Sequence, residues 1–133
     1  MVADKDRLRR SLFGARRYAE VLVAETDGHP VGFALFFHNY STFLGKPGLY
    51  LEDLYVTTPA RGAGVGRALL ARLARIAISR ECGRVEWSVQ DSNEQAIAFY
   101  KGLGARTMEG WQVFRVDSEA LTALAERYND ATK

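Results

Sequence analysis

The chain has 133 residues, of which 47% are hydrophobic and 26% are charged, a composition typical of a folded globular domain. A net charge of only +2 argues against nucleic acid or an anionic membrane as the main partner. The single cysteine, Cys82, excludes an internal disulfide, and the charged start of the sequence lacks the apolar stretch of a signal peptide. No apolar run approaches the ~20 residues that span a bilayer. We therefore expect one cytoplasmic domain over residues 1–133, with no membrane segment.

The first part of the sequence predicts a helix and a β-hairpin. Sparse apolar positions among charged ones favour a short amphipathic helix within residues 4–17. A strand rich in Val and Leu is expected over Tyr18–Glu25, and Asp27-Gly28 is a strong signal for a two-residue hairpin turn. The chain then returns as a strand over Pro30–His38.

The middle of the sequence predicts a loop, a strand and a helix. Residues 40–48 include Gly and Pro and indicate a loop. An apolar strand follows over Leu49–Val56, interrupted only by two acidic residues. A glycine-rich turn leads from it into a helix whose apolar residues recur at helical spacing from Val65 to Ala77, with Gly83 as its stop.

The last part predicts a strand, a helix, a strand and a helix in turn. The expected bounds are Arg84–Val89, a helix capped by Ser92 or Asn93 and ending at Lys101, Trp111–Val116, and a helix capped by Asp117 or Ser118 and ending near Arg127. The whole order is mixed α/β, antiparallel at first and with helical crossovers later, which favour parallel neighbours in the second half.

The turn before the long helix is the strongest functional signal. Gly62, Gly64 and Gly66 follow a strand and open a helix, so several backbone N–H groups can converge beside the positive end of the helix dipole. Such a turn suits a pyrophosphate. The dinucleotide fingerprint fails because Arg67 stands where its third glycine belongs, and the P-loop pattern fails as well. The alternative is a tight turn without a ligand.

Two motifs in this order resemble the GNAT N-acetyltransferase family. The first is Arg61-x-x-Gly64-x-Gly66, and the second runs from Asn93 through Phe99-Tyr100 to Gly104. The resemblance implies an α/β (α+β) fold with a mixed, mostly antiparallel sheet flanked by helices. The first strand and helix usual in the family are not seen in this sequence. The resemblance also implies acetyl-CoA as the donor of an acetyl group for an amine.

Within the family, the sequence looks most like the diamine (spermidine/spermine) and thialysine branch. The likeness lies in Gly45-Lys46, the strand Tyr50–Val56 and Gly110-Trp111. Three departures from that branch are Ser92, where a Trp is frequent, and Ser41 and Phe43, where polyamine enzymes carry an acidic residue and a Trp. They weaken the case for a long polyamine and leave a small primary amine as the expected substrate. An inactive acetyl-CoA-binding module and a protein or peptide N-acetyltransferase stay open as alternatives.

The resemblance implies a set of cofactor contacts on the strand, the loop and the second motif. These are Leu54, Tyr55, Val56, Arg61, Gly62, Ala63, Gly64, Val65, Gly66, Arg67, Asn93, Ala96, Phe99 and Lys101. The strand residues would offer backbone groups to the pantetheine arm, and the loop would surround the pyrophosphate. For Lys101 a solvated surface position is the equal alternative.

Glu52, Asp53 and Tyr100 are the candidates for the chemistry. Neighbouring strand residues point to opposite faces, so only one carboxylate would face a cleft unless a bulge brings both near it. Glu52 is expected as the general base or ammonium anchor and Asp53 as an amine contact; the alternative is a structural ion pair with an arginine. Tyr100 would ordinarily be a core residue at its helical spacing, and the resemblance makes it the general acid.

Two further expectations concern the substrate wall and assembly. Phe43 and His38 are candidates for contacts with the amine substrate. If the family's first strand is absent, the outer edge of the strand Tyr18–Glu25 has no partner. An open edge pairs readily with another chain, so we expect a homodimer or pairing with a partner segment.

Overall fold

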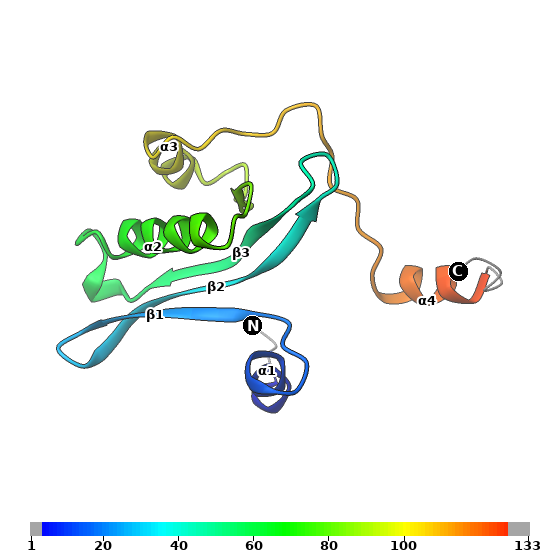
Figure 1. Cartoon of the computed structure of the whole chain (residues 1–133), viewed down its shortest axis with the longest axis horizontal. Helices are drawn as coiled ribbons and strands as arrows, with labels where there is room; N and C mark the ends of the chain where they lie inside the picture. The colour runs from blue at the N-terminus through cyan, green and yellow to red at the C-terminus, as the bar shows by residue number, and fades with distance from the viewer. Residues whose placement is uncertain (1–3, 128–133) are drawn as a thin grey trace. The chain divides into compact units, whose positions relative to one another are not determined.

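The computed structural model describes residues 4–127, and Figure 1 shows its elements. The chain divides into two compact units between Gln90 and Asp91. The first unit holds a four-stranded sheet with helices α1 and α2, and the second holds helices α3 and α4. The single domain over residues 1–133 stays a prediction. Within residues 4–127, no helix has both the length and the apolar character needed to cross a membrane.

Helix α1 (Lys5–Phe13) lies within the predicted range of residues 4–17, and residues at both of its ends stop it. The Asp4 carboxylate caps its start by accepting the backbone N–H of Asp6 at 2.9 Å. The helix ends at Gly14, where an added Cβ would lie 2.5 Å from the carbonyl oxygen of Arg10. Strand β1 (Glu20–Thr26) follows after a short connection.

The hairpin turn at Asp27-Gly28 is confirmed. Both residues have positive φ, 52° and 79°, which is the conformation of a two-residue turn whose twist matches the flanking strands. Strand β2 (His29–Ser41) returns antiparallel to β1, and Thr26 pairs with His29 at the turn.

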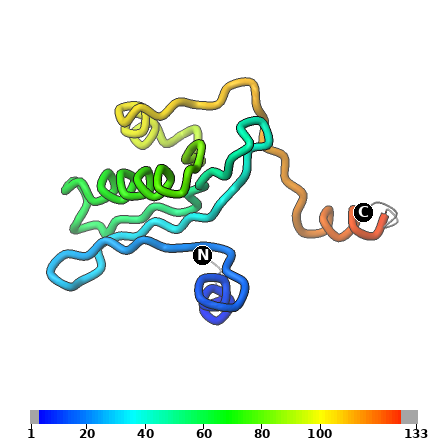
Figure 2. Tube along the Cα trace, in the orientation of Figure 1, coloured from blue at the N-terminus to red at the C-terminus, as the bar shows by residue number. Residues whose placement is uncertain are grey.

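The predicted loop over residues 40–48 is wrong, because most of it is strand. Strand β2 continues to Ser41, and β3 (Lys46–Val56) pairs antiparallel with it from Lys46 onward. Only residues 42–45 form the turn, the narrow bend at the end of the long hairpin in Figure 2. Ser41 closes this turn: its hydroxyl accepts the N–H of Leu44 at 3.1 Å and its carbonyl the N–H of Gly45 at 2.8 Å. A proline is tolerated at 47 because it lies next to the start of the strand.

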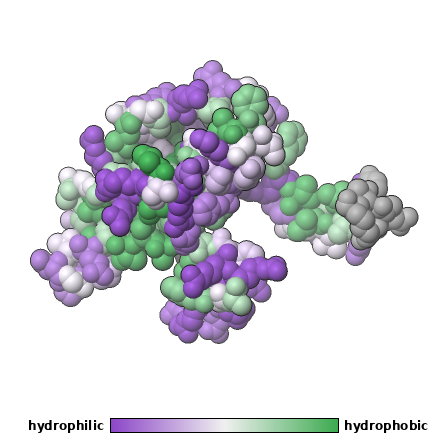
Figure 3. All heavy atoms as spheres, viewed as in Figure 1, coloured by the Kyte–Doolittle hydropathy of each residue, from purple (hydrophilic) through white to green (hydrophobic). Residues whose placement is uncertain are grey.

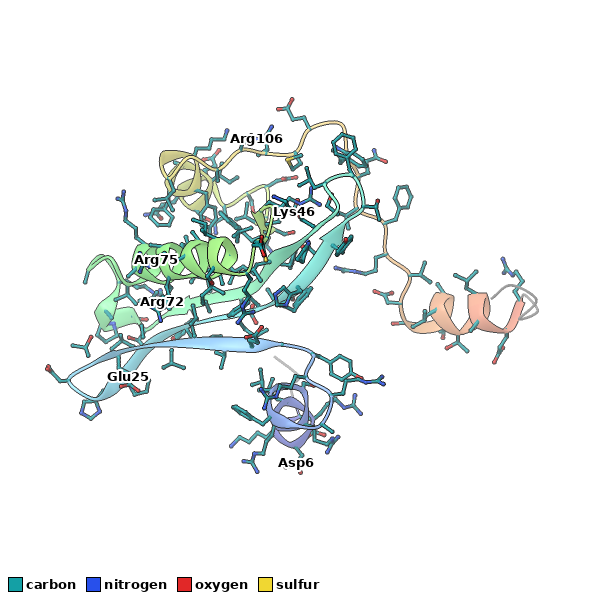
Figure 4. All side chains as sticks on the ribbon, in the orientation of Figure 1. Asp6, Glu25, Lys46, Arg72, Arg75 and Arg106 are labelled. Atoms are coloured by element: carbon teal, nitrogen blue, oxygen red, sulfur yellow. The ribbon has the colours of Figure 1, made fainter. Side chains whose placement is uncertain are left out.

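Helix α2 (Val65–Ser79) covers one face of β2 and β3 and forms the core with them. It ends before the predicted stop at Gly83, with Arg80 as C-cap. Its buried residues meet the inward row of the strands; the buried apolar set is Ala34, Phe36, Leu49, Leu51, Leu69, Leu70, Leu73 and Ala77. Full burial of each large side chain contributes ~1.5–3 kcal/mol. Arg72 and Arg75 lie on exposed positions of α2 (Figure 4).

Strand β4 (Val85–Glu86) runs parallel to β3, as the first helical crossover predicted. The expected strand over Arg84–Val89 is too long, because the chain leaves β3 after Glu86. Residues 84–86 are reached from α2 through Gly83, whose N–H donates to the carbonyl of Pro47 at 2.8 Å. The antiparallel β1-β2-β3 order with one parallel strand confirms the mixed, mostly antiparallel fold class.

In the second unit, α3 (Glu94–Gly102) and α4 (Ser118–Arg127) are helical as predicted. The strand expected over Trp111–Val116 is wrong: these residues have no regular structure. A strand forms only where a neighbouring strand pairs with it. Among the described residues, no strand pairs with residues 111–116. Apolar side chains are exposed in the second unit, among them Leu121 and Leu124 on α4. Figure 3 shows green, hydrophobic atoms over this helix.

Candidate active site

The two edges of β3 are paired very differently. On one side β2 pairs with it over its whole length. On the other side β4 pairs only at Leu49↔Val85 and Tyr50↔Glu86. Within residues 4–127, no strand continues this pairing along Leu51–Val56, so β3 has a free edge that begins where β4 departs. A free strand edge offers backbone hydrogen bonds to an extended ligand.

A β-bulge interrupts β3 at the predicted acidic pair. Phe36 is opposite Leu51 and Leu35 is opposite Asp53, so Glu52 is the extra residue without a cross-strand partner. Glu52 and Asp53 are both exposed. A bulge redirects a side chain that regular alternation would send to the opposite face, which is the condition under which the sequence predicted both carboxylates near one cleft.

The glycine loop connects β3 to α2 and has the geometry expected of an anion site. A short 3₁₀ turn, η1 (Thr58–Ala60), leads into it, and Gly62 and Gly64 both have φ of +85°. Gly64 is the N-cap of α2, so the first N–H groups of a 15-residue helix point out of its start without helical partners. An added Cβ at either glycine would meet nothing within 4 Å. Backbone conformation, rather than lack of room, therefore requires glycine here.

Gly66 differs from Gly62 and Gly64, because nothing within residues 4–127 requires a glycine at this position. It lies in the first turn of α2, and an added Cβ would be 3.8 Å from Val56 Cγ2 and 4.0 Å from Leu54 Cδ2. These are ordinary van der Waals distances, and the residue is helical. An alanine therefore fits the fold at this position.

Arg61 is fixed beside the loop by the end of β3. Its Nε donates to the carbonyl oxygen of Val56 at 3.0 Å, and its guanidinium carbon lies 5.8 Å from the centre of the Tyr55 ring. Of the three strand residues predicted to contact the cofactor, Leu54, Tyr55 and Val56, the last already uses its carbonyl within the chain. Arg67 is exposed in the first turn of α2. Ala63 and Val65 complete the loop at exposed and half-buried positions.

The second unit holds the other predicted contacts, all on or beside α3. Asn93 caps this helix, and its Oδ1 accepts the N–H of Ala96 at 3.1 Å. Tyr100 is half-buried with its ring 5.6 Å from that of Phe99, and burial raises the pKa of its hydroxyl above the ordinary 10.0. Phe99 is 42% exposed, and Lys101 is exposed in the last turn. The predicted cap is confirmed as Asn93, and its amide oxygen is engaged by the helix.

The structure does not bring Phe43 and Glu52 together within the chain. Phe43 is 96% exposed in the turn between β2 and β3. Lys46, beyond that turn, lies six strand residues from Glu52, which corresponds to ~20 Å at ~3.3 Å per residue. His38 has its Nε2 3.4 Å from Nη1 of Arg80. Its role as a substrate contact stays a prediction.

One feature of the site could not be read from the sequence. The Tyr50 hydroxyl and the Ser88 Oγ are 2.7 Å apart, and they join β3 to the segment that follows β4. Ser88 carries no local motif, and only the parallel register of β3 and β4 places it beside Tyr50. Together with the antiparallel register of β2 and β3, this register brings Asn39 Nδ2 to 3.1 Å from Glu86 Oε1.

Comparison with known proteins adds independent findings. Residues 3–105 match the sequence model of the Acetyltransferase (GNAT) family. The chain is 44% identical over 93 residues to L-ornithine N5-acetyltransferase NATA1 of Arabidopsis thaliana, covering 70% of this chain and 41% of that protein. It therefore spans less than half the length of that relative. It is 36% identical over 133 aligned residues to thialysine N-epsilon-acetyltransferase of Bos taurus, covering 92% and 78%. A solved integron cassette protein from the mobile metagenome of V. cholerae has a TM-score of 0.81 and 30% identity, covering 93% and 79%.

Proposed function

Because the chain belongs to the GNAT family of acetyltransferases, whose members use acetyl-CoA as donor, we propose that it acetylates a primary amine of a small molecule. The acceptor class is a diamine, a polyamine or an amino-acid-like amine. Transfer is direct, within a ternary complex of the chain, the donor and the amine.

The observation that carries the proposal is the course of β3. Its free edge, Leu51–Val56, begins at the two exposed carboxylates and ends at the glycine loop. Loop amides and Arg61 are suited to the donor's phosphates, and the strand edge is suited to an extended arm. The residues present therefore fit the donor, which supplies its acetyl group as a thioester. One strand links the anion site to the carboxylates of the acceptor side.

Glu52 is the residue we assign to the amine proton. A free amine has a pKa near ~10 and is mostly ammonium at neutral pH. Glu52 accepts a proton from it, directly or through a water, so that the nitrogen lone pair can form the new C–N bond as the C–S bond breaks. Asp53 holds the ammonium form of the acceptor beforehand. Their exposed position at the bulge supports both roles.

Tyr100 is the residue we assign to the departing sulfur. A phenol with the ordinary pKa of 10.0 is already protonated at neutral pH, and burial raises the pKa of Tyr100 further, so the hydroxyl holds a proton that it can donate to the thiolate. A thiol has an ordinary pKa of ~8.5, so proton transfer from a phenol to a thiolate is unfavourable for the isolated groups. In the reaction, the hydroxyl donates to the sulfur as negative charge develops on it. The assignment rests on the match of Asn93 and Phe99-Tyr100 to the family's second motif.

The small-amine acceptor is supported by the relatives. The bovine and Arabidopsis proteins are named for acetylation of thialysine and L-ornithine, both small molecules with a side-chain primary amine. We also infer a homodimer, formed through the outer edge of β1, which has β2 on one side and no strand on the other within residues 4–127. The cytoplasmic location stays a prediction from the sequence.

An acetylation screen tests the proposal. The full chain is mixed with acetyl-CoA and thialysine, L-ornithine, spermidine, an aminoglycoside or a lysine peptide, and thiol release is followed. We expect release with a small amine. Glu52→Gln should lower kcat roughly 100-fold, in line with the loss of a general base. Glu25→Gln, an exposed carboxylate on β1, is the matched control and should keep the wild-type rate.

The outcomes separate the alternatives. Calorimetric binding of acetyl-CoA without thiol release on any amine would indicate an inactive binding module. Release with the peptide but with no small amine would indicate a protein or peptide acetyltransferase. Wild-type turnover by Glu52→Gln would remove Glu52 as the base.

A further inference from the structure

A hydrogen bond closes one side of the point where β3 and β4 part. The last pair of the parallel ladder is Tyr50↔Glu86. Two residues after Glu86, the Ser88 Oγ lies 2.7 Å from the Tyr50 hydroxyl, so one bridge spans the gap beyond the last backbone pair. We refer to Tyr50 and Ser88 together as the side-chain bridge.

Packing fixes the tyrosine half of the side-chain bridge. The Tyr50 ring stacks on Phe37 with centres 5.3 Å apart and an interplanar angle of 30°. Leu49 and Leu51 are buried in the core with α2, so alternation along β3 places Tyr50 on the opposite face of the sheet. Ring stacking and the exposed bond to Ser88 therefore fix the position of the hydroxyl at the start of the free edge.

We propose that the side-chain bridge limits the length of the acyl group that the enzyme transfers. This rests on the proposed function, in which the donor's phosphates lie at the start of α2 and its arm follows the free edge of β3. An arm laid from the glycine loop towards Leu51 has its acyl end at the departure point of β4. At that point the paired part of β3 and β4 blocks the space beyond the acyl group, and the side-chain bridge blocks the same space on one face of the sheet.

An acetyl group ends at this closure, and each further methylene has to displace the bridge. Enzyme sites discriminate one methylene by ~10–200-fold, so the expected preference of the wild type for acetyl-CoA over propionyl-CoA lies in that range. Removing either hydroxyl breaks the bridge and frees space at the closure without removing a ladder hydrogen bond, because the backbone pairs at Leu49 and Tyr50 are unaffected.

The test compares kcat/KM for acetyl-CoA and propionyl-CoA, with the best amine from the screen, in Ser88→Ala and Tyr50→Phe. We expect the propionyl-to-acetyl ratio to rise about tenfold in each variant, at the lower end of the range for one methylene. The double variant should show no larger rise than the stronger single one, because both remove the same bridge. Two control variants make the same chemical changes away from the bridge. Ser79→Ala removes a serine hydroxyl at the end of α2, and Tyr40→Phe removes a tyrosine hydroxyl on β2; both should leave the propionyl-to-acetyl ratio unchanged.

Circular dichroism and thermal unfolding establish that the variants are folded. An unchanged ratio in the folded variants, or additive effects in the double variant, overturns the inference while the proposed function stands. If the wild type binds acetyl-CoA without turnover, the ratio of calorimetric affinities for the two acyl-CoA compounds decides in the same way. If it binds neither compound, the proposed function fails, and the inference fails with it.

Discussion

Gly66 offers the sharpest separation of fold from function at a single residue. Because an added Cβ meets only ordinary contacts in the first turn of α2, Gly66→Ala should raise the free energy of unfolding by ~0.5–1 kcal/mol through helix propensity. The same methyl group stands where we propose that the donor's phosphates bind, so acetyl-CoA affinity should fall at least tenfold. Thermal unfolding and calorimetry measure the two effects on one sample.

Gly64→Ala serves as the control for that prediction. Its φ of +85° is strained for any residue with a Cβ, so this variant should lose ~1 kcal/mol or more of stability as well as affinity. Undiminished acetyl-CoA affinity in Gly66→Ala would mean that the anion site lies away from the start of α2.

The sequence predicted residues whose role depends on nearby positions in the chain. It did not predict residues whose position depends on pairing between strands. The glycines at 62 and 64 and the Asn93 cap follow from backbone conformation and helix chemistry that the sequence carries nearby. The bulge at Glu52 depends on the register of β3 against β2, so the sequence could state it only as a condition. Ser88 was missed because its partner is 38 positions away in sequence.

Helices, turns and strands also divide into those that a local pattern predicts and those that depend on pairing with a distant segment. The helices and the Asp27-Gly28 hairpin were found because their patterns are periodic or local. The hairpin around Phe43 was misread as a loop because Pro and Gly outweighed the pairing that extends β2 and β3. The strand expected over Trp111–Val116 is wrong because a segment of residues that favour strands cannot supply the neighbouring strand that it needs.

An ion pair joins β1 to the end of α2 and makes the sheet sensitive to acid. Arg80 donates to both carboxylate oxygens of Glu20, at 2.8 and 2.9 Å. This hydrogen bonding, with smaller contributions from the charges of Arg80, His38 and Arg17, holds the Glu20 pKa below its ordinary 4.5, and burial opposes the shift. A lowered folded-state pKa means that the pair stabilises the fold above pH 4.5 and that this stabilisation is lost as pH falls through the lower folded value.

Glu20→Gln should therefore be less stable than the wild type at pH 7, by less than ~1 kcal/mol because the pair is exposed. The difference should vanish in acid, below the folded pKa of Glu20. Urea unfolding at the two pH values measures it, with Glu25→Gln on the same strand as the control. An equal loss of stability at both pH values would show that packing, rather than the charge pair, is responsible.

The outer edge of β1 is the surface through which we propose that two chains associate. β1 is the first strand of the β1-β2-β3-β4 order, and its central residue Val23 is 54% exposed. Backbone groups along an open edge favour pairing with another strand. We expect light scattering at micromolar concentration, without added peptide, to give the mass of a dimer.

A charge placed on that edge should prevent the pairing. Val23→Lys puts an ammonium group in the middle of β1, where charged residues block edge-to-edge association, and should give a monomer with wild-type secondary structure. Ile78→Lys changes an apolar side chain that is 76% exposed on α2 and lies outside the sheet, so its mass should remain that of the wild type. A stable wild-type monomer at micromolar concentration would refute the dimer. Dimers of both lysine variants would instead move the interface away from β1.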